Sequence, residues 1–195
     1  SGKFLFAARV IPYRGSWLDF EFDAKDIIHV RFDRRRKMPV TTLLYALGLS
    51  AEDILDYYYN RLTYKKVKGG WSVTFDPDRW RSVKPTFDLV NAKDGSVLIE
   101  AGTKITPRTV KKLQEEGVLN VLLPDDDLIN RFAAEDIINE KTGEIYIEAG
   151  EEISQEHLDL FAEVGVKVID VLDIDHMRVG PFLRNTLMAD KCQNR

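Results

Sequence analysis

Alternating apolar and polar residues predict two neighbouring strands near the start of the chain. In the first, Leu18, Phe20 and Phe22 fall on one face. The opposite face carries one large aromatic residue, Trp17, among acidic residues. In the second strand, residues 27–33, the apolar positions again alternate with polar ones. Each strand therefore has one core face and one polar face, and Trp17 lies on the polar face.

The second strand ends in a block of cations. Asp33 is followed at once by Arg34, Arg35, Arg36 and Lys37. An outward tryptophan beside four cations is typical of a surface that stacks on a base and holds phosphates. The same pattern also fits an edge tryptophan covered by a loop, next to a basic turn that is only solvated. In that alternative, one arginine pairs with Asp33 or Asp19.

The following segments predict two helices and a hairpin. Pro39 suits the first turn of a helix that ends at Gly48, and Ser50, with Asp53 three residues on, begins a second helix that runs to about Tyr59. Strands 61–67 and 71–75 then form a hairpin around two glycines. The sequence Arg79-Trp80-Arg81 is either a second contact patch or, as we favour, a linker that packs its tryptophan inward.

An internal repeat occupies the second half of the chain, at an offset of 48 residues. The copies span about residues 87–123 and 135–171. Each predicts a strand, a glycine turn, a strand ending in Glu-Ala-Gly, a capped helix and a closing strand. Identical pairs include Asp88/Asp136, Asn91/Asn139, Gly95/Gly143, Ala101/Ala149, Gly102/Gly150 and Gly117/Gly165. We expect two ββαβ-like units that share one core.

Charge divides the chain into unlike parts. Residues 1–40 hold nine basic and five acidic side chains, whereas residues 85–175 hold eight basic and 21 acidic side chains. A segment with a net charge of −13 is repelled by a phosphate backbone. The sequence therefore predicts nucleic-acid contact in the N-terminal part only.

Three segments resemble the β subunit of bacterial DNA-directed RNA polymerase. They are residues 8–23 (ARVIPYRGSWLDFEFD), residues 30–48 (VRFDRRRKMPVTTLLYALG) and residues 176–187 (HMRVGPFLRNTL). Because that subunit is several times longer than 195 residues, the resemblance implies a fragment. It implies an α+β fold in which residues 1–61 and 176–195 form part of the lobe, a mixed domain of strands and two short helices. Residues 62–175 would be an acidic, β-rich insertion carried by some bacterial lineages.

The resemblance also implies a function in transcription. The lobe of this family lines the DNA cleft and contacts non-template single-strand and downstream DNA, and the tryptophan that matches Trp17 stacks on a non-template base. Asp33 and Arg34 match residues along the same single-strand path. Arg34, Arg35, Arg36 and Lys37 can neutralise phosphates, and we expect half of these four cations to touch nucleic acid. Implied partners are DNA, the other core subunits, the sigma factor, and protein regulators that dock on the acidic insertion.

We expect no catalytic residue and no metal site in this chain. The three histidines are far apart in the sequence, and no Ser or Cys is paired recognisably with a histidine. Asp173-Ile174-Asp175-His176 and Asp125-Asp126-Asp127 are expected to be solvated turns. The resemblance implies that the magnesium ion of the polymerase lies in another subunit, so that the fragment needs no cofactor.

The cell compartment and one alternative function complete the expectations. Cys192 is the single cysteine, which excludes an intrachain disulfide and favours a reducing compartment, and no apolar run is long enough to span a bilayer. Together with the resemblance, this predicts a cytoplasmic, nucleoid-associated protein with no membrane partner. The alternative is a scaffold whose acidic repeats bind protein partners without nucleic-acid contact.

Overall fold

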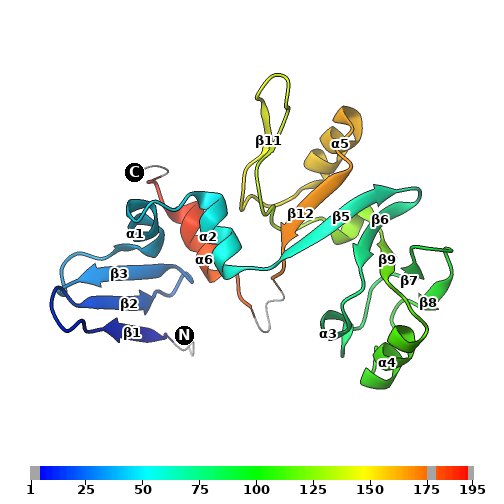
Figure 1. Ribbon diagram of the computed structural model, residues 1–195, viewed down its shortest axis with the longest axis horizontal. Coiled ribbons are helices and arrows are strands. Elements are labelled where there is room, and N and C mark those ends of the chain that lie inside the picture. The colour runs from blue at the N-terminus through cyan, green and yellow to red at the C-terminus, as the bar shows by residue number, and fades with distance from the viewer. Residues whose placement is uncertain (1–4, 175–178, 193–195) are drawn as a thin grey trace. The chain divides into compact units, whose positions relative to one another are not determined.

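The computed structural model describes residues 5–174 and 179–192, which form two compact units (Figure 1). The first unit comprises residues 1–61, 132–151 and 172–195, and the second comprises residues 62–131 and 152–171. The described residues hold six α-helices and three antiparallel sheets, a mixed α+β architecture as predicted. The part of the predicted lobe segment that begins at His176, residues 176–178, lies outside the described residues, as does Asp175.

A four-stranded antiparallel sheet forms one side of the first unit. Its order is β1-β2-β3-β4. The two strands predicted from alternation are β2 (Leu18–Phe22) and β3 (Ile28–Phe32), which pair in a continuous register from Leu18↔Phe32 to Phe22↔Ile28. The edges are β1 (Ala7–Val10) and β4 (Met38–Pro39).

Helices α1 (Val40–Ala46) and α6 (Phe182–Ala189) pack against this sheet. Helix α2 (Ala51–Tyr58) packs on both of these helices, and all three contribute to one core. The predicted cap of α2 is confirmed, because Ser50 Oγ accepts from Asp53 N (3.1 Å) and Asp53 Oδ2 accepts from Ser50 N (2.8 Å). Val30, Ile54 and Leu55 are fully buried in the core between sheet and helices.

A buried polar network joins the ends of α1 and α6. The carboxylate of Asp190 accepts from the hydroxyls of Thr41 (2.5 Å) and Thr42 (2.9 Å), and also from the N–H of Cys192 (3.0 Å). On α6, Thr186 Oγ1 accepts from Ile28 N of β3 (2.9 Å). Because buried polar groups are costly without partners, these bonds fix how the two helices meet the sheet.

The hairpin of the second repeat copy belongs to the first unit. It consists of β10 (Ile137–Ile138) and β11 (Ile145–Ile147), a two-stranded sheet of its own. At its base, Ala134 and Ala149 are buried in the same core as Ile54. The next residue, Gly150, accepts a hydrogen bond from Arg184 Nε of α6 (2.7 Å). These contacts attach the hairpin to the helices of the first unit.

The second unit is built on a six-stranded sheet with the order β12-β5-β6-β9-β7-β8. The predicted hairpin is present as β5 and β6, and its turn contains Gly69. Strand bounds are β5 Arg61–Val67, β6 Gly70–Thr74, β7 Leu89–Asn91, β8 Val97–Ile99, β9 Asn120–Leu123 and β12 Val168–Leu172. The helices are α3 (Pro77–Trp80), α4 (Pro107–Glu115), α5 (Gln155–Val164) and the 3₁₀ turn η1 (Asp125–Asp127).

Aromatic residues contribute to the largely aliphatic core of the second unit. Tyr64 is fully buried, and its hydroxyl donates to Asp127 Oδ2 (2.6 Å), which also pairs with Arg131 (3.1 Å). Burial raises the pKa of Tyr64 to about 12. Trp80 is also buried, and α3 packs on α4, so the inward packing predicted for the tryptophan of Arg79-Trp80-Arg81 is confirmed.

The two predicted copies contain elements that begin 48 residues apart, but these elements do not share one core. The starts of β8 and β11, of α4 and α5, and of β9 and β12 all keep this offset. Asp88 Oδ1 accepts from Ala101 N (2.7 Å), and Asp136 Oδ1 accepts from Ala149 N (2.6 Å). However, β7 and β8 lie in the six-stranded sheet, whereas the second hairpin packs in the first unit. The expectation of a single shared core is therefore wrong for that hairpin.

Two adjacent glycines allow a test of the close approach of β6 and β9. Both Gly69 and Gly70 have positive φ, but only at Gly70 would a Cβ meet backbone, 2.5 Å from the carbonyl oxygen of Leu123. We expect Gly69→Ala to cost about 1–3 kcal/mol of unfolding free energy from backbone strain alone. Gly70→Ala should cost clearly more, because β9 must also shift. Urea denaturation of both variants checks this, and equal losses would contradict it.

The network around Asp190 gives a second stability prediction. Asp190→Ala leaves the buried hydroxyl of Thr41 without its acceptor, so we expect a loss of about 1–3 kcal/mol of unfolding free energy. The matched control is Asp126→Ala, which removes an exposed carboxylate of η1 and should leave stability unchanged. Urea denaturation of the two variants measures the difference. An unchanged Asp190→Ala variant would show that the network contributes nothing.

Candidate nucleic-acid interface

The outward face of the four-stranded sheet carries rows of charged residues across the strands. Because side chains alternate along a strand, residues that pair across β1, β2 and β3 share one face. The register aligns Arg9 with Asp19, and Asp19 with Arg31. It also aligns Glu21 with His29. Cations from the flanking strands are thus opposite or diagonal to the acids of the central strand.

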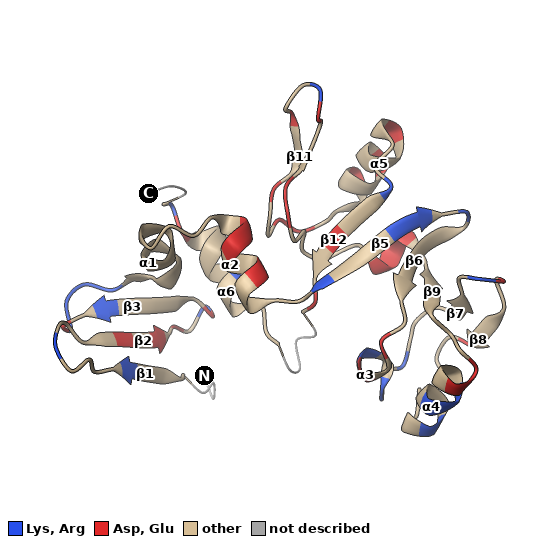
Figure 2. Ribbon diagram, in the orientation of Figure 1, with Lys and Arg blue, Asp and Glu red and all other residues tan. Residues whose placement is uncertain are grey.

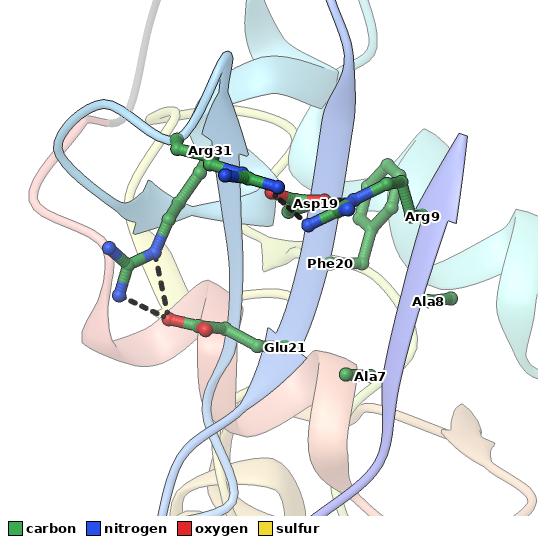
Figure 3. A pocket seen from close by; sticks show the side chains of 8 residues that line it. Ala7, Ala8, Arg9, Asp19, Phe20, Glu21 and Arg31 are labelled. Carbon is green, nitrogen blue, oxygen red and sulfur yellow. Dashed lines mark hydrogen bonds and ion pairs between the residues drawn. The ribbon is translucent and has the colours of Figure 1, made fainter. Parts of the chain in front are cut away.

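These cations neutralise the acidic residues of β2 (Figure 3). Arg9 forms a two-pronged ion pair with Asp19, in which Nη2 is 3.2 Å from Oδ2. Arg31 binds Glu21 Oε1 through Nη2 (2.9 Å) and Nε (3.1 Å). The hydrogen bond from Arg9 lowers the pKa of Asp19, and the positive charges of Arg34 and Arg31 act in the same direction. The acidic character that the sequence assigns to this face is therefore cancelled locally.

Trp17 lies at the end of β2 with its side chain partly exposed, at 39% of its maximal area. Its backbone is held on both sides by Asp33: Trp17 N donates to Asp33 Oδ1 (2.8 Å), and Asp33 N donates to Trp17 O (3.0 Å). The guanidinium carbon of Arg9 is 5.3 Å from the centroid of the indole ring, a cation–π contact. The tryptophan predicted to face outward does so from a fixed backbone.

The cationic block begins in a tight turn after β3. Asp33 and Arg34 both have positive φ (47° and 60°), and Arg35 N donates to Phe32 O (2.9 Å). Positive φ at both central residues is the pattern of a type I′ turn, for which aspartate is well suited. Hydrogen bonds from the hydroxyl of Ser16 and from Trp17 N lower the pKa of Asp33. Asp33 therefore acts within the turn, and its carboxylate is already occupied.

The four cations of the block are all exposed. Lys37 Nζ is 3.9 Å from Glu21 Oε1, whereas no described acidic residue forms an ion pair with Arg34, Arg35 or Arg36. Asp19 is paired with Arg9 instead, and Asp33 with backbone and Ser16. The alternative in which an arginine of the block is paired with one of these two aspartates is not what the structure shows.

A shallow depression of about 520 Å³ lies beside this block. Its lining residues are the cations Arg9, Arg31 and Arg34, the acids Asp19 and Glu21 that pair with two of them, and Ala7, Ala8 and Phe20. Sequence reasoning did not single out Arg9 and Arg31 as site residues. The available signal was their position: both fall on the outward phase of their strands, opposite Asp19. The depression thus joins two cations of the sheet to the first arginine of the block.

The described residues show neither a metal-site arrangement nor a membrane-spanning helix. In the described parts of the chain, no group of three or more His, Cys, Asp or Glu side chains has the arrangement of a metal site. No helix among the described residues has the length and apolar character needed to cross a membrane.

Comparison with known proteins assigns the chain to one family. A family profile described as RNA polymerase Rpb2, domain 2, matches residues 6–69. The β subunit of DNA-directed RNA polymerase from Jannaschia sp. (strain CCS1) is 59% identical over 208 residues, covering all of this chain and 15% of the relative. The β subunit from Caulobacter vibrioides is 55% identical over 191 residues, covering 98% of this chain and 14% of the relative. That from Paracoccus denitrificans is 54% identical over 211 residues, covering all of this chain and 15% of the relative.

The match therefore extends across both units, including the acidic segment that the family profile does not reach. The chain spans about one seventh of the length of these relatives. On the sequence identity over its full length and the profile match to its N-terminal part, the chain belongs to the family of bacterial DNA-directed RNA polymerase β subunits, within which residues 6–69 correspond to Rpb2 domain 2.

Proposed function

We propose that this chain serves as the lobe region of a polymerase β subunit and contacts single-stranded non-template DNA. The observation that carries the proposal is the surroundings of Trp17: an exposed indole on a sheet face whose acids are neutralised, next to three arginines with no acidic partner among the described residues. An indole face stacks on any base, and stacking contributes about 1–3 kcal/mol per base. Arginines without acidic partners are available to phosphates.

The roles within the site differ by residue. Trp17 would stack on a base, and Arg34 would bind a phosphate at the rim of the depression, with Arg9 and Arg31 facing the same space. Arg35 and Arg36 are exposed and extend the phosphate path, and Lys37 contributes less because Glu21 is near it. Asp33 would act indirectly, because its hydrogen bonds hold the backbone of Trp17.

The chain contributes binding to the polymerase, with nucleotidyl transfer carried out elsewhere in the enzyme. In this proposal the catalytic magnesium lies in another subunit, and the other core subunits and the sigma factor are partners of the complete β subunit. We also propose that the acidic second half is a duplicated module that offers a docking surface to protein regulators in the bacterial cytoplasm. Its support is the 48-residue offset between matching elements and the net charge of residues 113–171, which hold 16 acidic and three basic side chains.

The domain boundaries predicted from sequence are refined in this proposal. Removing all of residues 62–175 would also remove Ala134, Ala149 and Leu172 from the core of the first unit. We propose that residues 62–131 and 152–171 form the separate body, and that the hairpin segment 132–151 is part of the lobe.

Substitution of Trp17 separates a DNA contact from a structural role. Because the side chain is 39% exposed, we expect Trp17→Ala to lower unfolding free energy by less than about 1 kcal/mol. In assembled polymerase, the loss of one stacked base should shorten the open-complex lifetime by about fivefold to 150-fold and alter start-site preference. Thermal melting of the chain and open-complex lifetime of the holoenzyme are the paired measurements.

Two control variants accompany this test. Trp71→Ala removes a buried indole and should destabilise the chain by about 3–5 kcal/mol. Tyr57→Ala removes an aromatic ring that is 79% exposed on α2 and should change neither stability nor open complexes. If Trp17→Ala unfolds the chain like Trp71→Ala, or leaves open complexes unaffected like Tyr57→Ala, the proposed stacking role is wrong.

Substitution of Arg34 tests the phosphate contact. A lost phosphate contact weakens binding for all sequences alike, and for single-stranded DNA it lowers the slope of log K against log[salt] by about 0.7. We expect this change for Arg34→Gln with single-stranded DNA of several sequences. Lys25→Gln removes an exposed charge at the opposite end of the β2–β3 pair and should keep the full slope. Equal slopes for the two variants would contradict the assignment of Arg34.

A further inference from the structure

The positive charges of the second unit lie mainly in the earlier part of its sequence. Residues 62–75 hold three basic and no acidic side chains, and residues 76–112 hold eight basic and five acidic side chains, a net charge of +3 for each segment. The later parts of this unit, residues 113–131 and 152–171, together carry −8. Figure 2 shows blue segments at α3 and α4 of this unit. The acidity assigned to the whole segment from residue 85 onward thus belongs to its later part. The earlier part is not repelled by phosphate.

Backbone hydrogen bonds join two segments of this part that carry basic residues. Ser82 N donates to Ile105 O (2.9 Å), Ile105 N donates to Val83 O (2.8 Å), and Gly102 N donates to Pro85 O (2.8 Å). The segment 81–85 therefore runs beside the segment 102–105, which leads into α4. We define the basic cluster as the four cations on these two segments and the first turn of α4: Arg81, Lys84, Lys104 and Arg108.

Most of the basic cluster has no acidic counterpart. Arg81 Nη2 is 3.3 Å from Asp78 Oδ1, but no described acidic residue forms an ion pair with Lys84, Lys104 or Arg108. The nearby carboxylate of Asp88 is occupied by Ala101 N (2.7 Å). By contrast, the next two cations along α4 do pair, Lys111 with Glu115 (3.9 Å) and Lys112 with Glu116 (3.6 Å). All four cluster residues are exposed, so they are available to an external anion.

The position of Arg108 is not explained by the stability of the helix. Pro107 is the first residue of α4 and Arg108 the second, next to the cap formed by Thr106. The N-terminal end of a helix carries a partial positive charge, so a cation there is unfavourable by about 0.3–1 kcal/mol. Lys104, just before the helix, adds a further positive charge beside the partial positive charge of the helix end. A bound anion would make this arrangement favourable, because its negative charge would face all of these positive charges.

The composition of this surface indicates the kind of partner. Val97 is the single large apolar side chain with high exposure among residues 76–112. Protein interfaces centre on buried aromatic or apolar anchors, and single-strand sites use aromatic stacking platforms. Contacts to the backbone of a duplex need cations alone.

We infer that the basic cluster binds the phosphate backbone of duplex DNA without reading its sequence. The contact lies in the second unit, and is thus distinct from the single-strand face proposed around Trp17. The choice of DNA over other duplexes rests on the proposed function, whereas the phosphate contact itself rests on the cluster alone.

The test measures binding of the whole 195-residue chain to a short fluorescent DNA duplex of arbitrary sequence, by anisotropy over a series of salt concentrations. In the cluster variant, Lys84→Gln, Lys104→Gln and Arg108→Gln are combined. Each lost phosphate contact lowers the slope of log K against log[salt] by about 0.9, so we expect a decrease of up to about 2.7. The matched control combines Lys111→Gln, Lys112→Gln and Lys141→Gln, which removes the same charge from other positions and should keep most of the slope.

Further measurements distinguish a failure of this inference from a failure of the proposed function. Trp17→Ala should weaken single-strand binding but leave duplex binding unaffected, whereas the cluster variant should do the reverse. An RNA duplex of the same sequence distinguishes DNA from duplex phosphate in general. Thermal melting should be unchanged or slightly higher for the cluster variant, because Arg108→Gln removes a cation from the start of α4. If wild-type chain binds no duplex, or if cluster and control variants have equal slopes, the inference is wrong.

Discussion

The exposed face of the first unit depends on the carboxylate of Asp33. This side chain accepts from the backbone of Trp17 across the strand pair, while its own backbone turns at positive φ to reverse the chain. One residue thus closes the end of the β2–β3 pair and starts the cationic block. The position of the Trp17 indole and the path of the chain through Arg34 and Arg35 both depend on this residue. Because the carboxylate is engaged, it does not pair with the arginines, which remain available.

Charge compensation within the sheet is the second requirement for a cationic surface on this face. Asp19 and Glu21 alone would repel a phosphate backbone, since like charges at short range cost energy. Arg9 and Arg31 occupy the flanking strands in register and cancel them. The unpaired arginines of the turn then set the sign of the local field. A surface with alternating charges in sequence therefore becomes a cationic one in space.

Local patterns predicted the elements well, and long-range pairing limited the rest. Alternation identified β2 and β3, and the caps at Ser50, Thr106 and Ser154 marked helices where the structure has them. The outward position of Trp17 followed from the same alternation. The pairing of Arg9 with Asp19 required the register of β1, which no local signal gives. The attachment of the second hairpin to α6 and the pairing of segment 81–85 with segment 102–105 are likewise tertiary contacts between distant segments.

The discontinuous core of the first unit has a consequence for synthesis on the ribosome. The sheet and helices α1 and α2 are complete by Tyr58, yet their apolar surface is covered by Leu183 and Leu187 of α6, which follow more than a hundred residues later. At about 5–20 residues per second, roughly 6–25 s pass between the two events. During that interval Ile54 and Leu55 lack part of their covering, whereas residues 62–131 already supply most of the second unit. The lobe is therefore the last part of this chain to acquire its native packing, and it is the part most in need of protection while translation continues.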